Sequence, residues 1–183
     1  MSNLSMIEPA QATGDAKNLL EEVAKTLGLV PNMTKAMANS PALLGGYLGL
    51  SGTMAGGTFD AGLRERIAIT VAEANGCEYC LSAHTYIGAN VAKVDSVELD
   101  QAREAKSSDP HTRAVLQLAD AIVRGRGQVD ASIFVDVRAA GVTDTEIAET
   151  VGHVAVNVLT NYFNNLAGTE NDWPVVTPHS QAA

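Results

Sequence analysis

The sequence predicts an all-α protein that folds as one domain. Apolar residues recur at spacings of three and four along most of the chain, and no segment alternates as a strand would. The composition is 46% hydrophobic but only 4% aromatic, which suits closely packed helices rich in Ala, Val, Leu and Ile. At 183 residues the chain can bury one core, whereas two domains would each be small. We expect a single domain over residues 1–183, with roughly eight to nine helices, a core from about 12 to 175, and flexible ends over 1–10 and 176–183.

The first half of the chain carries four helical segments. Residues 16–27 have one apolar face and end before a glycine. Residues 41–54 follow a serine and open with proline, an N-cap and first-turn pair, and their glycines are expected to allow close helix packing. Residues 63–74 end at Asn-Gly, a left-handed stop signal. Cys77 therefore lies at the start of the next helix, which we expect to reach about residue 92.

The second half carries four more helical segments. A capping-box pattern opens residues 96–105, and Asp-Pro opens residues 110–123. Residues 131–139 follow an aspartate and end before a glycine. A second capping box, Thr143 to Glu146, opens the last and longest helix. This helix carries an uncharged polar stripe that could line a pocket or meet a second subunit, and we favour the subunit contact. The stripe consists of His153, Asn157, Asn161 and Asn164.

Charge and hydropathy exclude several classes of partner. The net charge is −9 and no segment is rich in Lys or Arg, which argues against nucleic acid and anionic membrane surfaces. No apolar run reaches the ~18 residues of a membrane span, and the first residues lack the basic start and apolar block of a secretory signal. We therefore expect a soluble, cytoplasmic protein. In a reducing cytosol two cysteines indicate redox or metal chemistry rather than a structural disulfide.

The two cysteines of the chain form a Cys-x-x-Cys motif with a histidine one helical turn further on. In a helix, Cys77, Cys80 and His84 share one face, since they are spaced by three and four residues. Cα atoms three residues apart are separated by roughly 5 Å, within the range that a disulfide tolerates. These residues could form a redox pair or, with Glu65 as a further ligand, a zinc or redox-sensing site. The spacing alone leaves both interpretations open.

The position of the motif favours reactive thiols. A thiol reacts as its thiolate, and both a helix N-terminus and a nearby histidine lower the pKa of a cysteine. Cys77 has the first of these advantages and Cys80 has both. In the thioredoxin fold a Cys-x-x-Cys helix follows a strand, whereas here it follows a helix, so a thioredoxin fold is excluded.

Glu65 lies in the preceding helix, which is apolar on nearly every side and therefore buried. It shares a stripe with Ile69, so we expect its carboxylate to point into the protein, where it needs a partner. From the spacing alone, an ion pair with Arg64 or Arg66 is favoured over a role at the thiols.

The combined pattern is Glu65, eleven residues, Cys77, two residues, Cys80, three residues, His84. It resembles the AhpD-like alkylhydroperoxidase branch of the carboxymuconolactone decarboxylase superfamily, whose motif has every one of these spacings. Further similarity lies upstream in residues 30–38 and downstream in 161–170. The resemblance covers about residues 12–175.

The resemblance implies an all-helical domain that assembles as trimers or hexamers and reduces peroxides without haem, flavin or another cofactor. It assigns Cys80 as the peroxidatic cysteine that becomes a sulfenic acid, and Cys77 as the proton donor and resolving thiol. Glu65 and His84 would form the proton relay that activates Cys80. The implied reductant is a lipoyl-type or thioredoxin-like dithiol. Lactone decarboxylases of the superfamily lack the Cys-x-x-Cys, which argues against that activity here.

Two further expectations concern Tyr79 and oligomerisation. The best-known AhpD enzyme has a histidine where this chain has Tyr79. A phenol with a pKa near 10 cannot shuttle protons at neutral pH, so that histidine is dispensable or the activity is weaker, and we expect Tyr79 to pack rather than to form a hydrogen bond. A helix that is apolar on every side, such as 63–74, also suggests burial by association with further copies of the chain.

Overall fold

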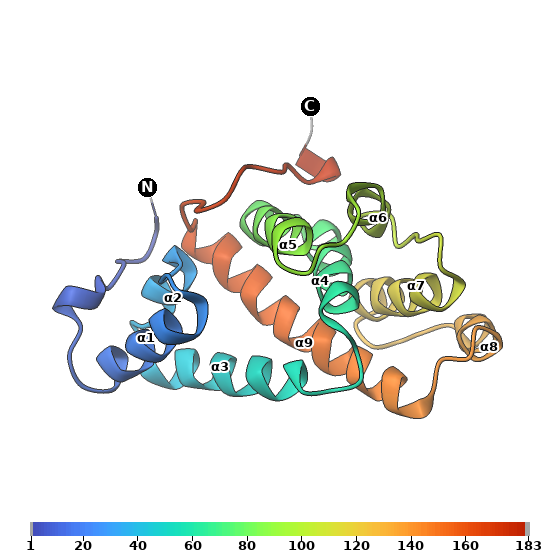
Figure 1. Cartoon of the computed structure of the whole chain (residues 1–183), viewed down its shortest axis with the longest axis horizontal. Coiled ribbons are helices and arrows are strands. Elements are labelled where there is room, and N and C mark those ends of the chain that lie inside the picture. Colours follow the sequence, from blue (N-terminus) through green and yellow to red (C-terminus); the bar gives the residue numbers. More distant parts are fainter. Residues whose placement is uncertain (1, 182–183) are drawn as a thin grey trace.

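The computed structural model describes residues 2–181, and this part of the chain contains helices but no strand (Figure 1). The predicted all-α class is therefore confirmed. Nine α-helices and two short 3₁₀ helices, η1 (Pro9–Gln11) and η2 (His179–Gln181), occur within the described residues. The α-helices are α1 (Gly14–Leu27), α2 (Asn32–Met37), α3 (Pro41–Ala55), α4 (Ala61–Ala74), α5 (Glu78–Asn90), α6 (Ser96–Ala102), α7 (Pro110–Gly125), α8 (Ala131–Ala139) and α9 (Asp144–Ala167).

Most of the predicted helix starts are confirmed because their cap residues bind backbone amides. The Ser40 hydroxyl accepts a hydrogen bond from the Leu43 amide at the start of α3. Asp109 does the same for α7. The capping box of Thr143 and Glu146 opens α9 with both of its hydrogen bonds present.

Several helix boundaries differ from the prediction by one to three residues, and one helix was not predicted. Helix α4 begins at Ala61, two residues early, because Asp60 accepts a hydrogen bond from the Leu63 amide. Helix α6 ends at Ala102 instead of residue 105, and its predicted capping box is absent because the Glu98 carboxylate accepts a hydrogen bond from the Ser107 hydroxyl instead, 2.6 Å away. Helix α2 was not predicted, since six residues are too few to show a helical period.

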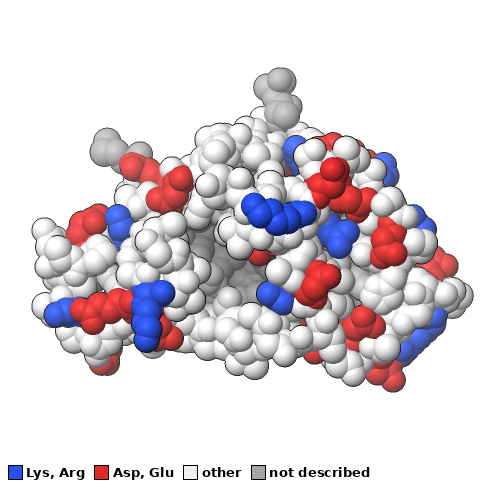
Figure 2. Space-filling model, in the orientation of Figure 1, with Lys and Arg blue, Asp and Glu red and all other residues white. Residues whose placement is uncertain are grey.

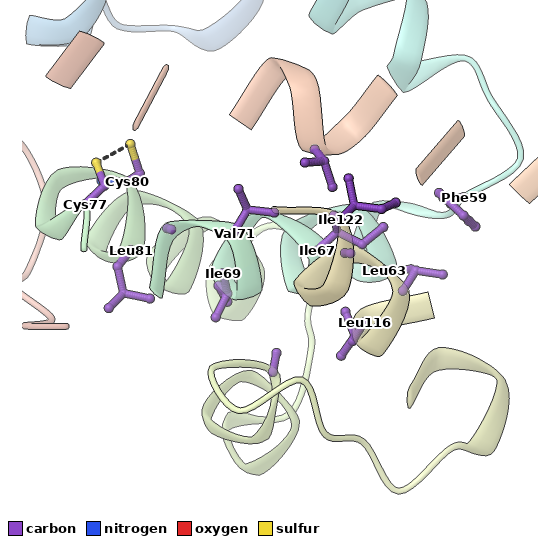
Figure 3. Packing of buried hydrophobic residues seen from close by; sticks show 14 of the residues in the cluster. Phe59, Leu63, Ile67, Ile69, Val71, Cys77, Cys80, Leu81, Leu116 and Ile122 are labelled. Carbon is purple, nitrogen blue, oxygen red and sulfur yellow. Dashed lines mark hydrogen bonds between the residues drawn. The ribbon is translucent and has the colours of Figure 1, made fainter. Parts of the chain in front are cut away.

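Helix α4 forms the centre of the domain and packs against α5, α6, α7 and α9. In Figure 3 the side chains of Ile69 and Val71 point to opposite sides of this helix, and both are fully buried. A helix that is apolar on every side is thus covered within one chain. Burial of α4 is thus complete without a second subunit, and any association of chains must involve other surfaces.

Helix α3 is much less buried than α4. Leu44 is its only buried residue, and a Cβ atom added at Gly46, Gly49 or Gly52 would meet nothing within 4 Å. The expected close packing is found at Gly45, where an added Cβ atom would lie 3.9 Å from the Leu19 side chain of α1, but not at Gly46 or Gly49 within the described residues. None of the helices in residues 2–181 is long and apolar enough to cross a membrane.

The described parts of both chain ends are bound to the domain, in contrast to the predicted flexible ends. Near the N-terminus, the Asn3 amide donates to the Ala167 carbonyl, 2.6 Å away. Residues 168–181, which we call the C-terminal strap, leave α9 and pass over the N-terminal end of α5 (Figure 1). The backbone amide of His179 in this strap donates to the buried carboxylate of Glu73, 2.6 Å away. Both ends are held because their backbone groups pair with groups of the helical core.

Candidate active site

The turn between α4 and α5 positions the two cysteines. Gly76 adopts a left-handed conformation, with φ of 61°, and ends the turn after α4. Cys77 is the N-cap residue of α5, so the predicted place of the motif at a helix N-terminus is confirmed. Its Sγ accepts a hydrogen bond from the backbone amide of Cys80, 3.3 Å away, as the oxygen of a serine N-cap would. Cys80 thereby lies directly beside Cys77 in the first turn.

The two thiols are free, buried and in contact. The exposed fraction is 0% for Cys77 and 2% for Cys80. Cys77 Sγ donates a hydrogen bond to Cys80 Sγ across 2.6 Å, the dashed line in Figure 3. A disulfide requires about 2.05 Å, so the pair can be oxidised with little movement of the backbone.

The surroundings give the two thiols opposite acidities. Burial acts to raise the pKa of Cys80, but the hydrogen bond from Cys77, the charge of His84 and the amides of Asn164 and Asn161 together lower that pKa to about 7. The pKa of Cys77 is raised, chiefly because its proton is held in the hydrogen bond to Cys80 and then by burial. The expectation that the helix N-terminus lowers the pKa of Cys77 is therefore wrong. Near neutral pH the site holds a Cys80 thiolate and a Cys77 thiol.

Glu65 and His84 form a hydrogen-bonded pair beside Cys80. The distance from His84 Nδ1 to Glu65 Oε2 is 2.7 Å, and the side chains are 25% and 18% exposed. Burial acts to lower the pKa of His84, but the charge and the hydrogen bond of Glu65, followed by the charge of Cys80, raise it. These contacts favour the protonated imidazolium form of His84 next to Cys80.

The predicted ion pair of Glu65 with a neighbouring arginine is wrong. Arg64 donates to the backbone carbonyl of Phe59, and Arg66 pairs with Glu98 at 3.2 Å. Neither guanidinium group forms an ion pair with Glu65 among the described residues. This leaves the Glu65 carboxylate to His84.

The polar stripe on α9 contributes to the site, which the sequence did not predict. Asn164 Nδ2 donates to Cys80 Sγ, 3.2 Å away, and Asn161 Oδ1 accepts from Asn75 Nδ2, 2.9 Å away. Asn161 and Asn164 are buried within one chain, so the favoured subunit contact is wrong for them. Their four-and-three spacing on an apolar helix was the available signal, and the pocket interpretation was the correct one.

Tyr79 has a specific hydrogen-bonding role rather than packing alone. Its hydroxyl donates to Asp172 Oδ2, 2.6 Å away, and accepts from the amide of Met33, 3.4 Å away. Burial, followed by the contact with Asp172, raises the pKa of Tyr79. The residue thus joins α5 to α2 and to the C-terminal strap, and the expectation of packing without a hydrogen bond is wrong.

A second tyrosine, Tyr47, approaches the site from α3. Burial raises its pKa, and the charges of Cys80 and Glu65 raise it further, whereas a hydrogen bond to Ser51 lowers it. Nothing in the sequence connected this residue with the cysteines, because the link depends on how α3 packs.

Two openings lie near the thiols. Figure 2 shows the molecular face hollowed near its centre, between α2 and α5. A cavity of about 370 Å³ lies under the C-terminal strap. It is lined by Gly76, Glu78, Tyr79, Asn164, Thr169 and Gln181, among others. Because Asn164 also contacts Cys80, this cavity reaches within one side chain of the sulfur.

The predicted alternative of a metal site finds no support in the arrangement of the described side chains. Within residues 2–181, no group of three or more His, Cys, Asp or Glu side chains could hold a metal ion.

Comparison with known proteins agrees with the motif. Residues 41–106 match the carboxymuconolactone decarboxylase family, whereas no curated protein matches the chain. The structure is similar to the alkylhydroperoxidase AhpD core of an uncharacterized peroxidase-related protein from Ralstonia eutropha JMP134. The TM-score is 0.82 at 26% identity, and the match covers 93% of this chain and 92% of that one.

Two further structures share the fold at lower identity. An uncharacterized peroxidase-related protein from Silicibacter sp. TM1040 gives a TM-score of 0.77 at 22% identity, covering 92% of this chain and 89% of the other. The debrominase Bmp8, in complex with 2,3,4-tribromopyrrole, gives 0.79 at 20% identity, covering 94% of this chain and 92% of the other. The resemblance inferred from the motif is thereby confirmed, and the fold hosts more than one activity.

Proposed function

Since this chain carries the carboxymuconolactone decarboxylase pattern within an AhpD-like fold, we propose that it is a thiol-dependent peroxidase. The substrate is an organic hydroperoxide or hydrogen peroxide. The observation that carries the proposal is the pairing of a Cys80 thiolate, with a pKa of about 7, with a protonated Cys77 in direct contact. These are the protonation states that a peroxidatic and a resolving thiol require before the peroxide is attacked.

In the first step the Cys80 thiolate attacks the terminal oxygen of the peroxide. An S–O bond forms, the O–O bond breaks, and sulfur is oxidised by two electrons to the sulfenic acid. The departing alkoxide needs a proton, and the His84 imidazolium, held by Glu65, is placed to give it. His84 thus stabilises the thiolate before the attack and acts as an acid during it.

In the second step Cys77 attacks the sulfenic sulfur. The S–S bond forms and the S–O bond breaks, with release of water. The contact between the two sulfurs supports this step, since the resolving thiol needs no large movement. An external dithiol then reduces the disulfide by exchange. A lipoyl-type or thioredoxin-like donor fits this requirement.

The protein is also proposed to act as a homo-oligomer, a trimer or hexamer. Large apolar side chains on α9 face solvent in the single chain and lie on the helix that packs against the glycine-rich α3. These side chains are Val151, Tyr162 and Leu166, which are 51%, 62% and 67% exposed. Light scattering on the purified protein tests this, and a monomer would contradict it.

A second candidate is reductive dehalogenation, which the fold of the debrominase Bmp8 brings into consideration. The observation in its favour is the contact between Cys77 and Cys80, since the same pair of thiols could supply the two electrons that debromination needs. The Cys80 thiolate would attack the bromine, so that an S–Br bond forms, the C–Br bond breaks and the ring carbon takes a proton. Cys77 would then attack the Cys80 sulfur, so that the S–S bond forms and bromide and a proton are released. Release of bromide from a bromopyrrole, measured against peroxide consumption, distinguishes the two activities.

The deciding experiment measures turnover of cumene hydroperoxide and hydrogen peroxide with dihydrolipoamide or thioredoxin as donor. We expect Cys80→Ser to abolish the activity. Cys77→Ser should allow one turnover that ends at the sulfenic acid, which dimedone labels. Full activity in both variants would refute the thiol mechanism. Formation of one disulfide without sustained turnover would favour the redox-sensing alternative, and stoichiometric zinc that silences the thiols would favour the metal-binding one.

A further inference from the structure

Two asparagines of α9, Asn161 and Asn164, act on the Cys80 sulfur. Their exposed fractions are 0% and 3%. They stand one helical turn apart and share one face of α9. Asn164 Nδ2 donates directly to Cys80 Sγ, 3.2 Å away. The peroxidatic thiol is therefore bounded by His84 on its own helix and by amides on another.

Each of these amides has one buried atom without a hydrogen-bond partner among residues 2–181. The atoms are Asn161 Nδ2, a donor, and Asn164 Oδ1, an acceptor. A buried polar atom left without a partner is costly, and native structures keep few of them. Two such atoms beside a reactive sulfur indicate that something formed or bound during the reaction supplies their partners.

The free donor of Asn161 is held in a fixed direction. Its Oδ1 accepts a hydrogen bond from Asn75 Nδ2, 2.9 Å away, which turns Nδ2 to the other side. Asn75 is itself anchored, since its backbone carbonyl accepts from Asn165 Nδ2, 3.2 Å away. The Asn161 amide also lowers the pKa of Cys80, which agrees with a donor that faces the sulfur.

The remaining groups around Cys80 already have other partners. The Cys77 thiol donates to the sulfur and later attacks it, and the Tyr47 hydroxyl bonds to Ser51. His84 binds Glu65 through Nδ1, and in the proposed reaction its other N–H gives its proton to the departing alkoxide. Among the described neighbours, the donor left for a new oxygen atom at Cys80 is Asn161 Nδ2.

We propose that Asn161 and Asn164 form a two-amide site for the oxygen atom that a peroxide leaves on Cys80. Asn164 Nδ2 holds the sulfur, and Asn161 Nδ2 donates to the oxygen of the sulfenate. The inference rests on the proposed peroxidase function. In that reaction the thiolate and ROOH, with one proton, give the sulfenic acid and ROH, so a single oxygen remains on sulfur. Bound in this way, it is turned away from Cys77, which keeps the sulfur open to attack by the resolving thiol.

The test uses the Cys77→Ser background, in which the sulfenic acid persists because no resolving thiol is present. One equivalent of cumene hydroperoxide is added, and dimedone labelling followed by mass spectrometry gives the yield and lifetime of the sulfenic acid. Asn161→Leu keeps the shape of the side chain but removes the donor. We expect the sulfenic acid to decay or overoxidise about tenfold faster, the effect of losing one charge-assisted hydrogen bond.

Two further variants separate this role from simple destabilisation. Asn157→Leu is the matched control, since Asn157 is buried on the same helix but donates to the backbone carbonyl of His153. It should leave the sulfenic acid lifetime unchanged. Asn75→Ala frees the Asn161 amide to rotate without touching the thiols, and should shorten the lifetime in the same direction.

The outcomes distinguish the inference from the function on which it rests. A lifetime in both Asn161→Leu and Asn75→Ala equal to that of the Cys77→Ser parent overturns the two-amide site and leaves the peroxidase proposal intact. Failure of the parent itself to form a sulfenic acid with any peroxide overturns both. Equal shortening in Asn157→Leu shows a general packing effect and also overturns the inference.

Discussion

Replacing His84 by glutamine tests whether this residue both stabilises the Cys80 thiolate and gives a proton to the leaving group. The substitution removes the imidazolium charge and keeps a side chain of similar length. It therefore removes a positive charge that lowers the pKa of Cys80. It also takes away the imidazole nitrogen that lies 2.7 Å from the Glu65 carboxylate. The Cys77→Ser background makes Cys80 the single thiol, and the serine hydroxyl keeps a hydrogen-bond donor at that position.

The expected loss of alkylation rate in His84→Gln follows from the pKa of Cys80. With a pKa of about 7, roughly half of Cys80 is thiolate at pH 7. A rise of one pKa unit reduces that fraction about fivefold, and a return to the ordinary thiol pKa of 9.0 reduces it about 50-fold. The more basic thiolate is the better nucleophile, by about threefold per unit. The net loss of alkylation rate at pH 7 is therefore about two- to sixfold.

Two assays then separate the two roles of His84. Alkylation by iodoacetamide needs no proton donor, so its rate in His84→Gln should be reduced at pH 7 and fully recovered at pH 9. The reaction with cumene hydroperoxide does need a proton, and it should stay reduced at pH 9 by a further factor of about 100 or more.

His111→Gln is the control, because His111 pairs with Glu146 at the start of α7. An unchanged alkylation profile in His84→Gln would show that His84 does not stabilise the thiolate. Complete recovery of the peroxide reaction at pH 9 would show that His84 does not give the proton.

Three other predictions concern stability. Tyr79→Phe removes the hydrogen bond to Asp172 and should cost about 1 kcal/mol, a fall in Tm of roughly 2–4 °C by calorimetry, while peroxide turnover changes less than twofold. Ile67→Ala opens a cavity at the fully buried centre of α4 and should cost about 2–5 kcal/mol by denaturant unfolding, and a loss under 1 kcal/mol would contradict this packing. Hydrogen bonds from Ser107 and Ser108, followed by the charge of Arg66, lower the pKa of Glu98 to about 2. Its stabilisation should therefore be present above pH 4.5 and lost as the pH falls towards 2, so Tm measured against pH should be flatter over that window in Glu98→Gln.

Much of the fold follows from local chemistry and was predictable. Caps such as Ser40 and Asp109 and the capping box of Thr143 and Glu146 fix helix starts through bonds over three residues, which the sequence displays directly. The errors arose where a cap-type residue had a distant partner instead. Glu98 binds Ser107, so a pattern that reads as a capping box does not form one.

In the candidate site, too, local contacts were predictable and contacts between distant residues were not. The motif placed Cys77, Cys80 and His84 together, because their contacts follow from the period of one helix. The pairing of Glu65 with His84 joins two helices. The sequence alone favoured an ion pair between Glu65 and an adjacent arginine instead. Asn164 and Tyr47 approach from helices far away in the sequence, and nothing local to either residue identifies Cys80 as its neighbour.

The choice of attacking thiol also depends on these contacts between helices. A helix N-terminus favours the thiolate at both positions of a Cys-x-x-Cys motif, and that effect alone does not select Cys80. Cys77 is the N-cap residue, and its proton is held in the bond to the other sulfur. Cys80 accepts that bond and also receives the charge of His84 and the amide of Asn164. The asymmetry of the pair therefore comes from the bond between the thiols, from His84 one turn further along α5 and from Asn164 on α9, so substitutions of His84 or Asn164 should raise the pKa of Cys80 and weaken its preference as the attacking thiol.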